Sequence, residues 1–193
     1  QTVAAFKTRV SLRETNSFSE NPTWVSTTGA DATFLHINTS IATQIESGGL
    51  VITTPSAITT DFDGDTRNVS TPDIGADEFT GVGLDLTGPS ISYTALTNTS
   101  SITNRSFTAV TITDATGVNT TAGTRPRVYY KRSTDANAYN DNTNATDGWK
   151  YVEANGAGGS PFDFTINYSL LNGGTGVVAG QTVQYFVVAQ DIA

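Results

Sequence analysis

The sequence predicts an all-β protein, and its threonines carry most of that prediction. Of the 193 residues, 34 are threonine, and most of them alternate with valine, isoleucine, phenylalanine or tyrosine, as in strands with one solvent-facing side. Charged residues make up only 15% of the chain, which is low for solvated helices. Because no stretch repeats apolar residues at positions i, i+3, i+4 and i+7, no helix is expected.

Residues 1–80 contain short apolar runs at irregular spacing. The runs lie at 3–6, 34–37 and 50–52, with an aromatic-valine pair at 24–25. Runs this short and nearly continuous favour strands buried on one side in stacked coils over long hairpin strands. We therefore predict that residues 1–80 are terminal coils of such a stack, together with their cap.

An acid-rich stretch, residues 61–79 (DFDGDTRNVSTPDIGADEF), closes this first part. It holds six carboxylates and one arginine. An end coil leaves an open sheet edge, and a charged loop folded over that edge hinders edge-to-edge association. The favoured interpretation is such a cap, with the guanidinium of Arg67 forked onto Asp73 or Asp77.

A calcium site is the alternative interpretation of the same stretch. Asp61, Asp63 and Asp65 stand at alternate positions and offer the oxygen ligands that a hard cation prefers. An EF-hand loop has glycine at its sixth position and a bidentate glutamate at its twelfth, whereas here glycine is fourth and the twelfth residue is Pro72. Calcium would therefore need an irregular ligand set, and no other cofactor is predicted.

The second part of the chain has a different period. The glycines and proline of residues 81–89 indicate a linker. In residues 90–193, apolar and polar residues alternate with a period of two in several runs. Six strands are predicted, at 90–96, 107–112, 127–131, 149–152, 162–166 and 183–188. Asparagine- and glycine-rich turns between them indicate a β-sandwich. A seven-stranded sandwich would lack its last strand here.

Two further candidates are weak on sequence grounds. The loop at residues 135–148 places Tyr139 among asparagines and aspartates. It is interpreted either as a solvated loop or as a contact site for carbohydrate or a cation. His36 is the only histidine and is interpreted as an ordinary strand residue facing out of the coil. With no cysteine in the chain, no disulfide, thiolate metal site or cysteine nucleophile is available.

Several motifs carry a family resemblance. The segments NPTWV at 21–25, FLHI at 34–37, DFDGDTR at 61–67 and PDIGADEF at 72–79 resemble the closing coils of right-handed parallel β-helix proteins of bacterial surfaces. Residues 39–43 depart from that pattern, which has a small-proline-small element there. Residues 90–193 resemble immunoglobulin-like or fibronectin III-like domains of large Bacteroidota surface proteins. The spacing from Gly180 to Tyr185 resembles their tyrosine-corner strand, where the phenol anchors a crossing loop.

The resemblance implies a non-catalytic, structural or adhesive segment of a large secreted cell-surface protein. Such proteins form extended, extracellular rods and include type IX-secreted adhesins of gliding bacteria. The expected partners are neighbouring domains of the same chain and surface polysaccharide or another cell-surface protein. The alternative is an accessory C-terminal region of a secreted polysaccharide-degrading enzyme. No catalytic residue carries over, because that family's catalytic residues lie in middle coils outside the matched segments.

Charge and the chain's first residues add two expectations. The net charge of −8 disfavours nucleic acid and anionic membrane surfaces as partners. No apolar run approaches the length that membrane insertion requires. The chain begins Gln1-Thr2-Val3 without an initiator methionine or signal peptide, which favours a processed segment of a longer protein.

Overall fold

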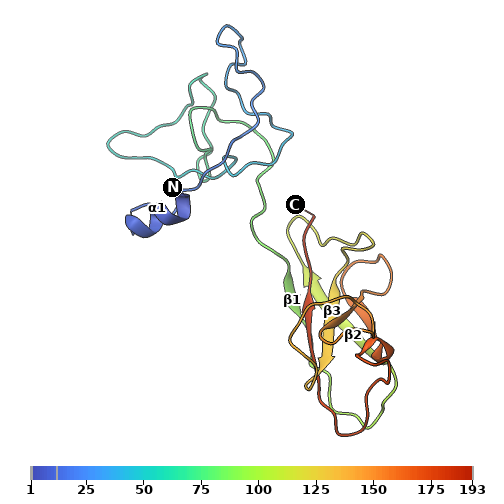
Figure 1. Cartoon of the computed structure of the whole chain (residues 1–193). Coiled ribbons are helices and arrows are strands. Elements are labelled where there is room, and N and C mark those ends of the chain that lie inside the picture. Colours follow the sequence, from blue (N-terminus) through green and yellow to red (C-terminus); the bar gives the residue numbers. More distant parts are fainter. Residues whose placement is uncertain (1, 12, 193) are drawn as a thin grey trace. The chain divides into compact units, whose positions relative to one another are not determined.

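The computed structural model describes residues 2–11 and 13–192, and the chain divides into two compact units (Figure 1). Unit 1 is Gln1–Leu84 and unit 2 is Asp85–Ala193, so the division falls within residues 81–89. The all-β class is confirmed, since most regular structure is strand and the helices are short. None of the helices in the described part of the chain is long and apolar enough to cross a membrane.

Unit 1 begins with a helix that the sequence analysis did not predict. Helix α1 spans Val3–Arg9. The Thr2 side chain caps it by accepting the main-chain N–H of Ala5 at 3.2 Å, and Lys7 and Arg9 lie in its last turn, where cations are favourable. The prediction of a stacked β-coil at residues 3–6 is therefore wrong, because the capping threonine and the two alanines favour a helix there.

The rest of unit 1 has neither strands nor further helices among its described residues. Its pairing is limited to isolated bridges, which join Trp24 to Ile37, Ser26 to Phe34, Thr43 to Gly83, and Thr60 to Thr66. The predicted strand at residues 50–52 is wrong, because these residues form no strand or bridge and Leu50 is 81% exposed. Most main-chain N–H groups of this unit therefore need acceptors other than a strand neighbour.

Unit 2 contains two antiparallel three-stranded sheets, and a strand lies at each of the six predicted places, although the first covers only residues 90–92 of the predicted 90–96. The first sheet has the order β1-β2-β5, with β1 Ser90–Ser92, β2 Arg105–Thr113 and β5 Phe162–Ile166. The second has the order β4-β3-β6, with β4 Lys150–Glu153, β3 Arg127–Arg132 and β6 Val183–Val188. A short 3-10 helix, η1 Tyr168–Leu170, follows β5.

Both sheets contribute to one hydrophobic core. Alternate residues of β5 (Phe162, Phe164 and Ile166) are buried, as the period of two predicts. In β2 the register shifts between Phe107 and Val110, and this irregularity lets both side chains face inward although three positions separate them. From the second sheet, Tyr130 is fully buried and donates its hydroxyl to the main-chain oxygen of Asn167 at 2.6 Å.

Tyr185 ties the segment before β2 to strand β6. Its phenol oxygen accepts the main-chain N–H of Leu96 at 2.6 Å, across 89 residues of sequence. Its ring lies edge-on to Phe107, with 5.4 Å between the centroids. This bond reaches the segment between β1 and β2, whereas the hydrogen bond of a tyrosine corner goes to the backbone only a few residues upstream.

Candidate functional site

The carboxylates of residues 61–79 accept main-chain N–H groups of unit 1. Asp61 Oδ1 accepts from the N–H groups of Asp63 at 2.9 Å and Asp65 at 2.8 Å, and its Oδ2 accepts from Glu78 at 2.9 Å. Burial acts to raise the pKa of Asp61, but these N–H donors outweigh it and hold the pKa below its ordinary value. Asp61 therefore closes its own loop and joins the two ends of the stretch.

Asp73 also accepts main-chain N–H groups, and it is more deeply buried than Asp61. It is 4% exposed, and its two oxygens accept the N–H groups of Ser47 at 2.6 Å and Phe79 at 2.7 Å. Burial raises the pKa of Asp73 despite these donors, and the nearby charges of Glu46 and Glu78 raise it further. This carboxylate crosslinks two distant segments of a unit whose described residues form no sheet.

Arg67 binds different partners from those predicted. Its Nη1 lies 3.3 Å from Glu78 Oε2 and donates to the main-chain oxygen of Asp73 at 3.0 Å, while Nη2 donates to Gly75 O at 2.5 Å. The predicted fork onto the Asp73 or Asp77 carboxylate is wrong. Both oxygens of Asp73 are engaged by main-chain N–H groups, and Asp77 turns toward His36.

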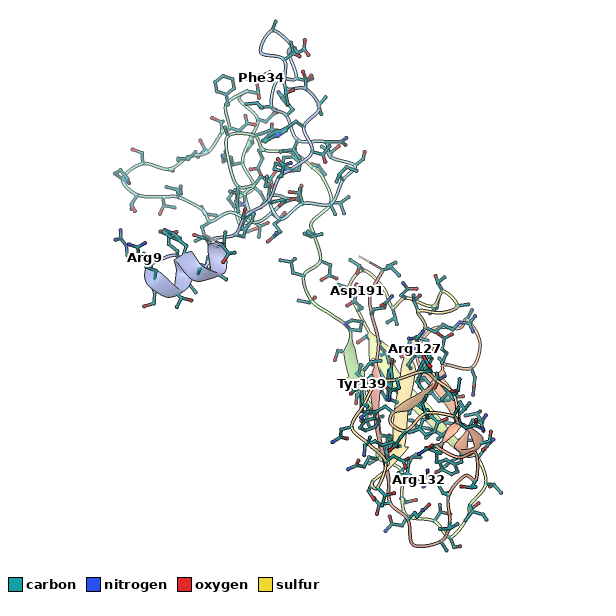
Figure 2. All side chains as sticks on the ribbon, in the orientation of Figure 1. Arg9, Phe34, Arg127, Arg132, Tyr139 and Asp191 are labelled. Atoms are coloured by element: carbon teal, nitrogen blue, oxygen red, sulfur yellow. The ribbon has the colours of Figure 1, made fainter. Side chains whose placement is uncertain are left out.

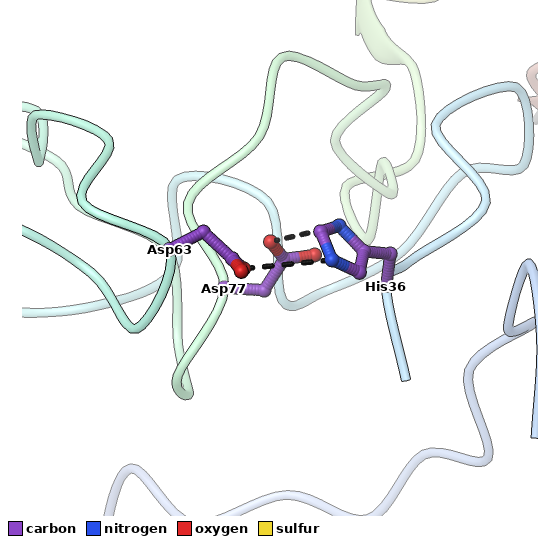
Figure 3. A group of neighbouring side chains, drawn as sticks. All are labelled: His36, Asp63 and Asp77. Carbon is purple, nitrogen blue, oxygen red and sulfur yellow. Dashed lines mark ion pairs between the residues drawn. The ribbon is translucent and has the colours of Figure 1, made fainter. Parts of the chain in front are cut away.

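The side chains of the three predicted calcium ligands, Asp61, Asp63 and Asp65, face different partners and do not meet at one point. Asp61 uses both oxygens on main-chain N–H groups, whereas Asp65 lines an open hollow beside Asp77. Asp63 instead faces His36, with its Oδ2 3.5 Å from His36 Nε2 (Figure 3). The structure therefore brings only Asp63 of this trio into the cluster that could hold a metal ion.

His36, Asp63 and Asp77 form that cluster. Each offers one ligand atom, and these atoms all lie within 4.8 Å of one another (Figure 3). Asp77 Oδ1 is 3.6 Å from His36 Nδ1, so the imidazole stands between two carboxylates rather than facing away from a coil. Sequence reasoning missed His36 and Asp77 as members, because no local spacing links a lone histidine to acids on distant loops.

A second feature is an aromatic surface on unit 2, on the sheet face away from the core. Tyr129 of β3 pairs across the sheet with Tyr151 of β4 and Phe186 of β6, and its ring centroid is 5.4 Å from each of theirs. Trp149 packs edge-on against Phe186 at 4.9 Å. All four rings are partly exposed.

Tyr139 completes this surface from the loop before β4 (Figure 2). It is 66% exposed and stacks on Trp149 with 6.2 Å between centroids and 12° between planes. The loop is fixed to the sheet edge because Asn142 exchanges two hydrogen bonds with the main chain of Tyr151, at 2.8 and 3.1 Å. The aromatic face is defined here as Tyr129, Tyr139, Trp149, Tyr151 and Phe186.

Polar groups lie at the margin of the aromatic face. Arg127 is 4.2 Å from the centre of the Tyr151 ring and pairs with Glu153 at 3.0 Å. Partly exposed rings with hydrogen-bonding groups beside them suit a ligand that has an apolar face and polar edges. Of these five rings only Tyr139 is a candidate from the sequence, because the other four lie in predicted strands.

No protein-family model, no curated protein and no solved structure matches this chain.

Proposed function

We propose that this chain is a non-catalytic, adhesive segment of a secreted cell-surface protein, and that unit 2 binds polysaccharide through the aromatic face. The observation that carries the proposal is the set of five mutually packed, partly exposed rings on one side of the β4-β3-β6 sheet. A sugar ring presents C–H groups on its faces and hydroxyls at its edges. The aromatic rings pack against the C–H faces, and the polar margin hydrogen-bonds to the hydroxyls.

The charge of the chain restricts the ligand. A net charge of −8 repels polyanions at long range, so the proposed ligand is a neutral polysaccharide. Two positive groups lie beside the rings, and both are engaged within the chain. Arg127 pairs with Glu153, and the buried Lys131, 5.4 Å from the centre of the Trp149 ring, donates to the main-chain oxygens of Arg132 and Asp135. The hydroxyl of Tyr139 supplies a neutral hydrogen-bonding group.

The finer architecture belongs to the same proposal. Two antiparallel sheets around one core support an immunoglobulin-like sandwich for unit 2. The resemblance of residues 21–79 supports unit 1 as the closing segment of a parallel β-helix, in an extracellular rod of the type IX-secreted kind. In such a rod, unit 1 connects domains and unit 2 contacts the surface.

The test is binding of the whole chain to a panel of neutral polysaccharides, with release of reducing sugar measured on the same panel. Retention that falls at least about tenfold in Tyr139→Ala supports the proposal. The matched control is Phe62→Ala, which removes an aromatic ring that is 87% exposed on unit 1. Sugar release by the wild-type chain contradicts the non-catalytic assignment, and absence of any retention contradicts the adhesive one. The length of the parent gene distinguishes an adhesin from an accessory region of an enzyme.

A further inference from the structure

We propose that His36, Asp63 and Asp77 form a binding site for a divalent transition-metal ion of the zinc type. This ligand set differs from the predicted Asp61, Asp63 and Asp65 trio, and it contains a nitrogen donor. An imidazole with two carboxylates is a ligand combination for zinc and its first-row neighbours, whereas calcium takes oxygen ligands.

The distance between His36 and Asp63 fits such an ion, and the three ligand atoms lie within 4.8 Å of one another. Zinc binds histidine nitrogen and carboxylate oxygen at about 2.1 Å, so two ligand atoms of a tetrahedral site are about 3.4 Å apart. His36 Nε2 and Asp63 Oδ2 are 3.5 Å apart, which is longer than an ordinary hydrogen bond and close to this spacing. Asp77 Oδ1 lies 3.6 Å from the other ring nitrogen, Nδ1, so an ion bound to Nε2 requires rotation of the imidazole, which is 33% exposed, to bring the third ligand into reach.

The main chain around the three ligands holds them in place. Phe62 donates its N–H to Ala76 O at 3.0 Å, which pins together the residues immediately before Asp63 and Asp77. The second oxygen of Asp77 accepts the N–H of Ile37 at 3.2 Å, so this carboxylate is oriented by the residue next to His36. Outer contacts of this kind fix the direction of metal ligands.

The backbone that presents His36 is also constrained. The bridge between Trp24 and Ile37 is flanked by a hydrogen bond of 2.8 Å from Val25 N to His36 O. Leu35 has φ of 59°, a left-handed conformation that is uncommon for a non-glycine residue. Leu35 is held there by donating its N–H to Ser26 O at 2.8 Å. The histidine therefore has a defined position before any ion binds.

The electrostatic surroundings favour a cation. His36 and Asp77 line an open hollow whose other lining carboxylates are Glu46, Asp65, Asp73 and Glu78. Among the described residues that line it, none is a lysine or arginine. With a single imidazole and two carboxylates as ligands, the remaining coordination positions are open to water.

The test uses the full chain without a histidine tag, because its only histidine then gives one set of imidazole resonances. Zinc is titrated into metal-free protein at neutral pH while the ring ¹H and ¹⁵N shifts and the heat of binding are recorded. We expect saturation at one ion per chain with a change in the ring resonances, and no ring change with calcium. Zinc that leaves the ring resonances unchanged overturns the proposal without requiring any variant.

Variants then assign the ligands. His36→Gln, Asp63→Asn and Asp77→Asn should each weaken zinc binding by about tenfold or more, whereas Asp65→Asn should not. Thermal unfolding in chelator shows that each variant retains the wild-type fold. Undiminished binding in His36→Gln, or a loss in Asp65→Asn equal to that in Asp63→Asn, overturns the assigned ligand set. Co²⁺ provides an independent readout, because its visible absorption reports the ligand geometry and should vanish in His36→Gln.

Discussion

Asp61 Oδ2 accepts the main-chain N–H of Glu78 at 2.9 Å, and this bond joins the two ends of the acid-rich stretch. The other oxygen of Asp61 serves Asp63 and Asp65. Unit 1 has almost no strand pairing, so a carboxylate with three N–H donors replaces part of a sheet. Asp61, Asp73, Asp77 and Glu78 of this stretch thus accept main-chain N–H groups, and a cap over a sheet edge stays a prediction.

Asp61→Asn is expected to destabilise unit 1 by about 1–3 kcal/mol, because the amide removes the charge and leaves only one good acceptor for three N–H groups. Urea unfolding followed by a probe in unit 1, such as Trp24 fluorescence in a Trp149→Phe background, measures the change. Asp65→Asn is the matched control in the same loop. Equal stability of Asp61→Asn and Asp65→Asn would contradict the acceptor role of Asp61.

Acid should weaken unit 1 through Asp61. Its folded-state pKa lies below the ordinary value of 3.8, so its contribution is fully present above pH 3.8 and is lost as pH falls through the folded pKa. Unfolding free energies measured from pH 7 to pH 2 should therefore fall more steeply for the wild type than for Asp61→Asn. Parallel curves for the two proteins would argue against this linkage.

Protonation of Asp73 should change the free energy of unfolding in the opposite direction from protonation of Asp61. Its folded-state pKa is raised above 3.8, so its contribution to stability grows as pH falls through that raised value. This growth offsets part of the loss from Asp61. In Asp73→Asn the offset is absent, and the decline of stability with falling pH should begin at a higher pH than in the wild type. An unchanged onset in the same pH series would contradict the raised pKa.

Tyr185→Phe is expected to destabilise unit 2 by about 1–2 kcal/mol, because it leaves the N–H of Leu96 without its acceptor while preserving the ring that packs on Phe107. Thermal and urea unfolding measure the loss. Tyr93→Phe is the control, since Tyr93 is 38% exposed and its ring also packs on Phe107. A loss of stability as large in Tyr93→Phe would show that the Leu96 bond is not the cause.

The strands of unit 2 could be predicted because their burial follows their sequence period. Phe162, Phe164 and Ile166 are inward-facing, and the bounds of β5 and β6 agree with the prediction. Unit 1 could not be predicted in this way. Its run at residues 50–52 is exposed, and its connections are side chain to main chain across long separations, such as 26 residues from Ser47 to Asp73. No local pattern reports such a bond.

The candidate sites show the same limit. Asp63 stood out by its spacing, but its neighbours His36 and Asp77 come from loops whose approach depends on bonds such as Phe62 N to Ala76 O. Tyr139 is a candidate because it lies in a polar loop, whereas the other four rings lie in predicted strands. Pairing of β3 with β4 and β6 puts Tyr129 beside Tyr151 and Phe186, and the sequence alone does not define that register.

Trp149 should report ligand binding to the aromatic face. The chain has two tryptophans, and in Trp24→Phe the fluorescence comes from Trp149 alone. Because Tyr139 stacks on Trp149, a neutral oligosaccharide that settles on these rings should exclude water and shift the emission to shorter wavelength. The same titration in a Trp24→Phe, Tyr139→Ala double variant should require at least about tenfold more sugar. A shift of equal midpoint in both proteins would place the sugar elsewhere on unit 2 and contradict the assignment of this face.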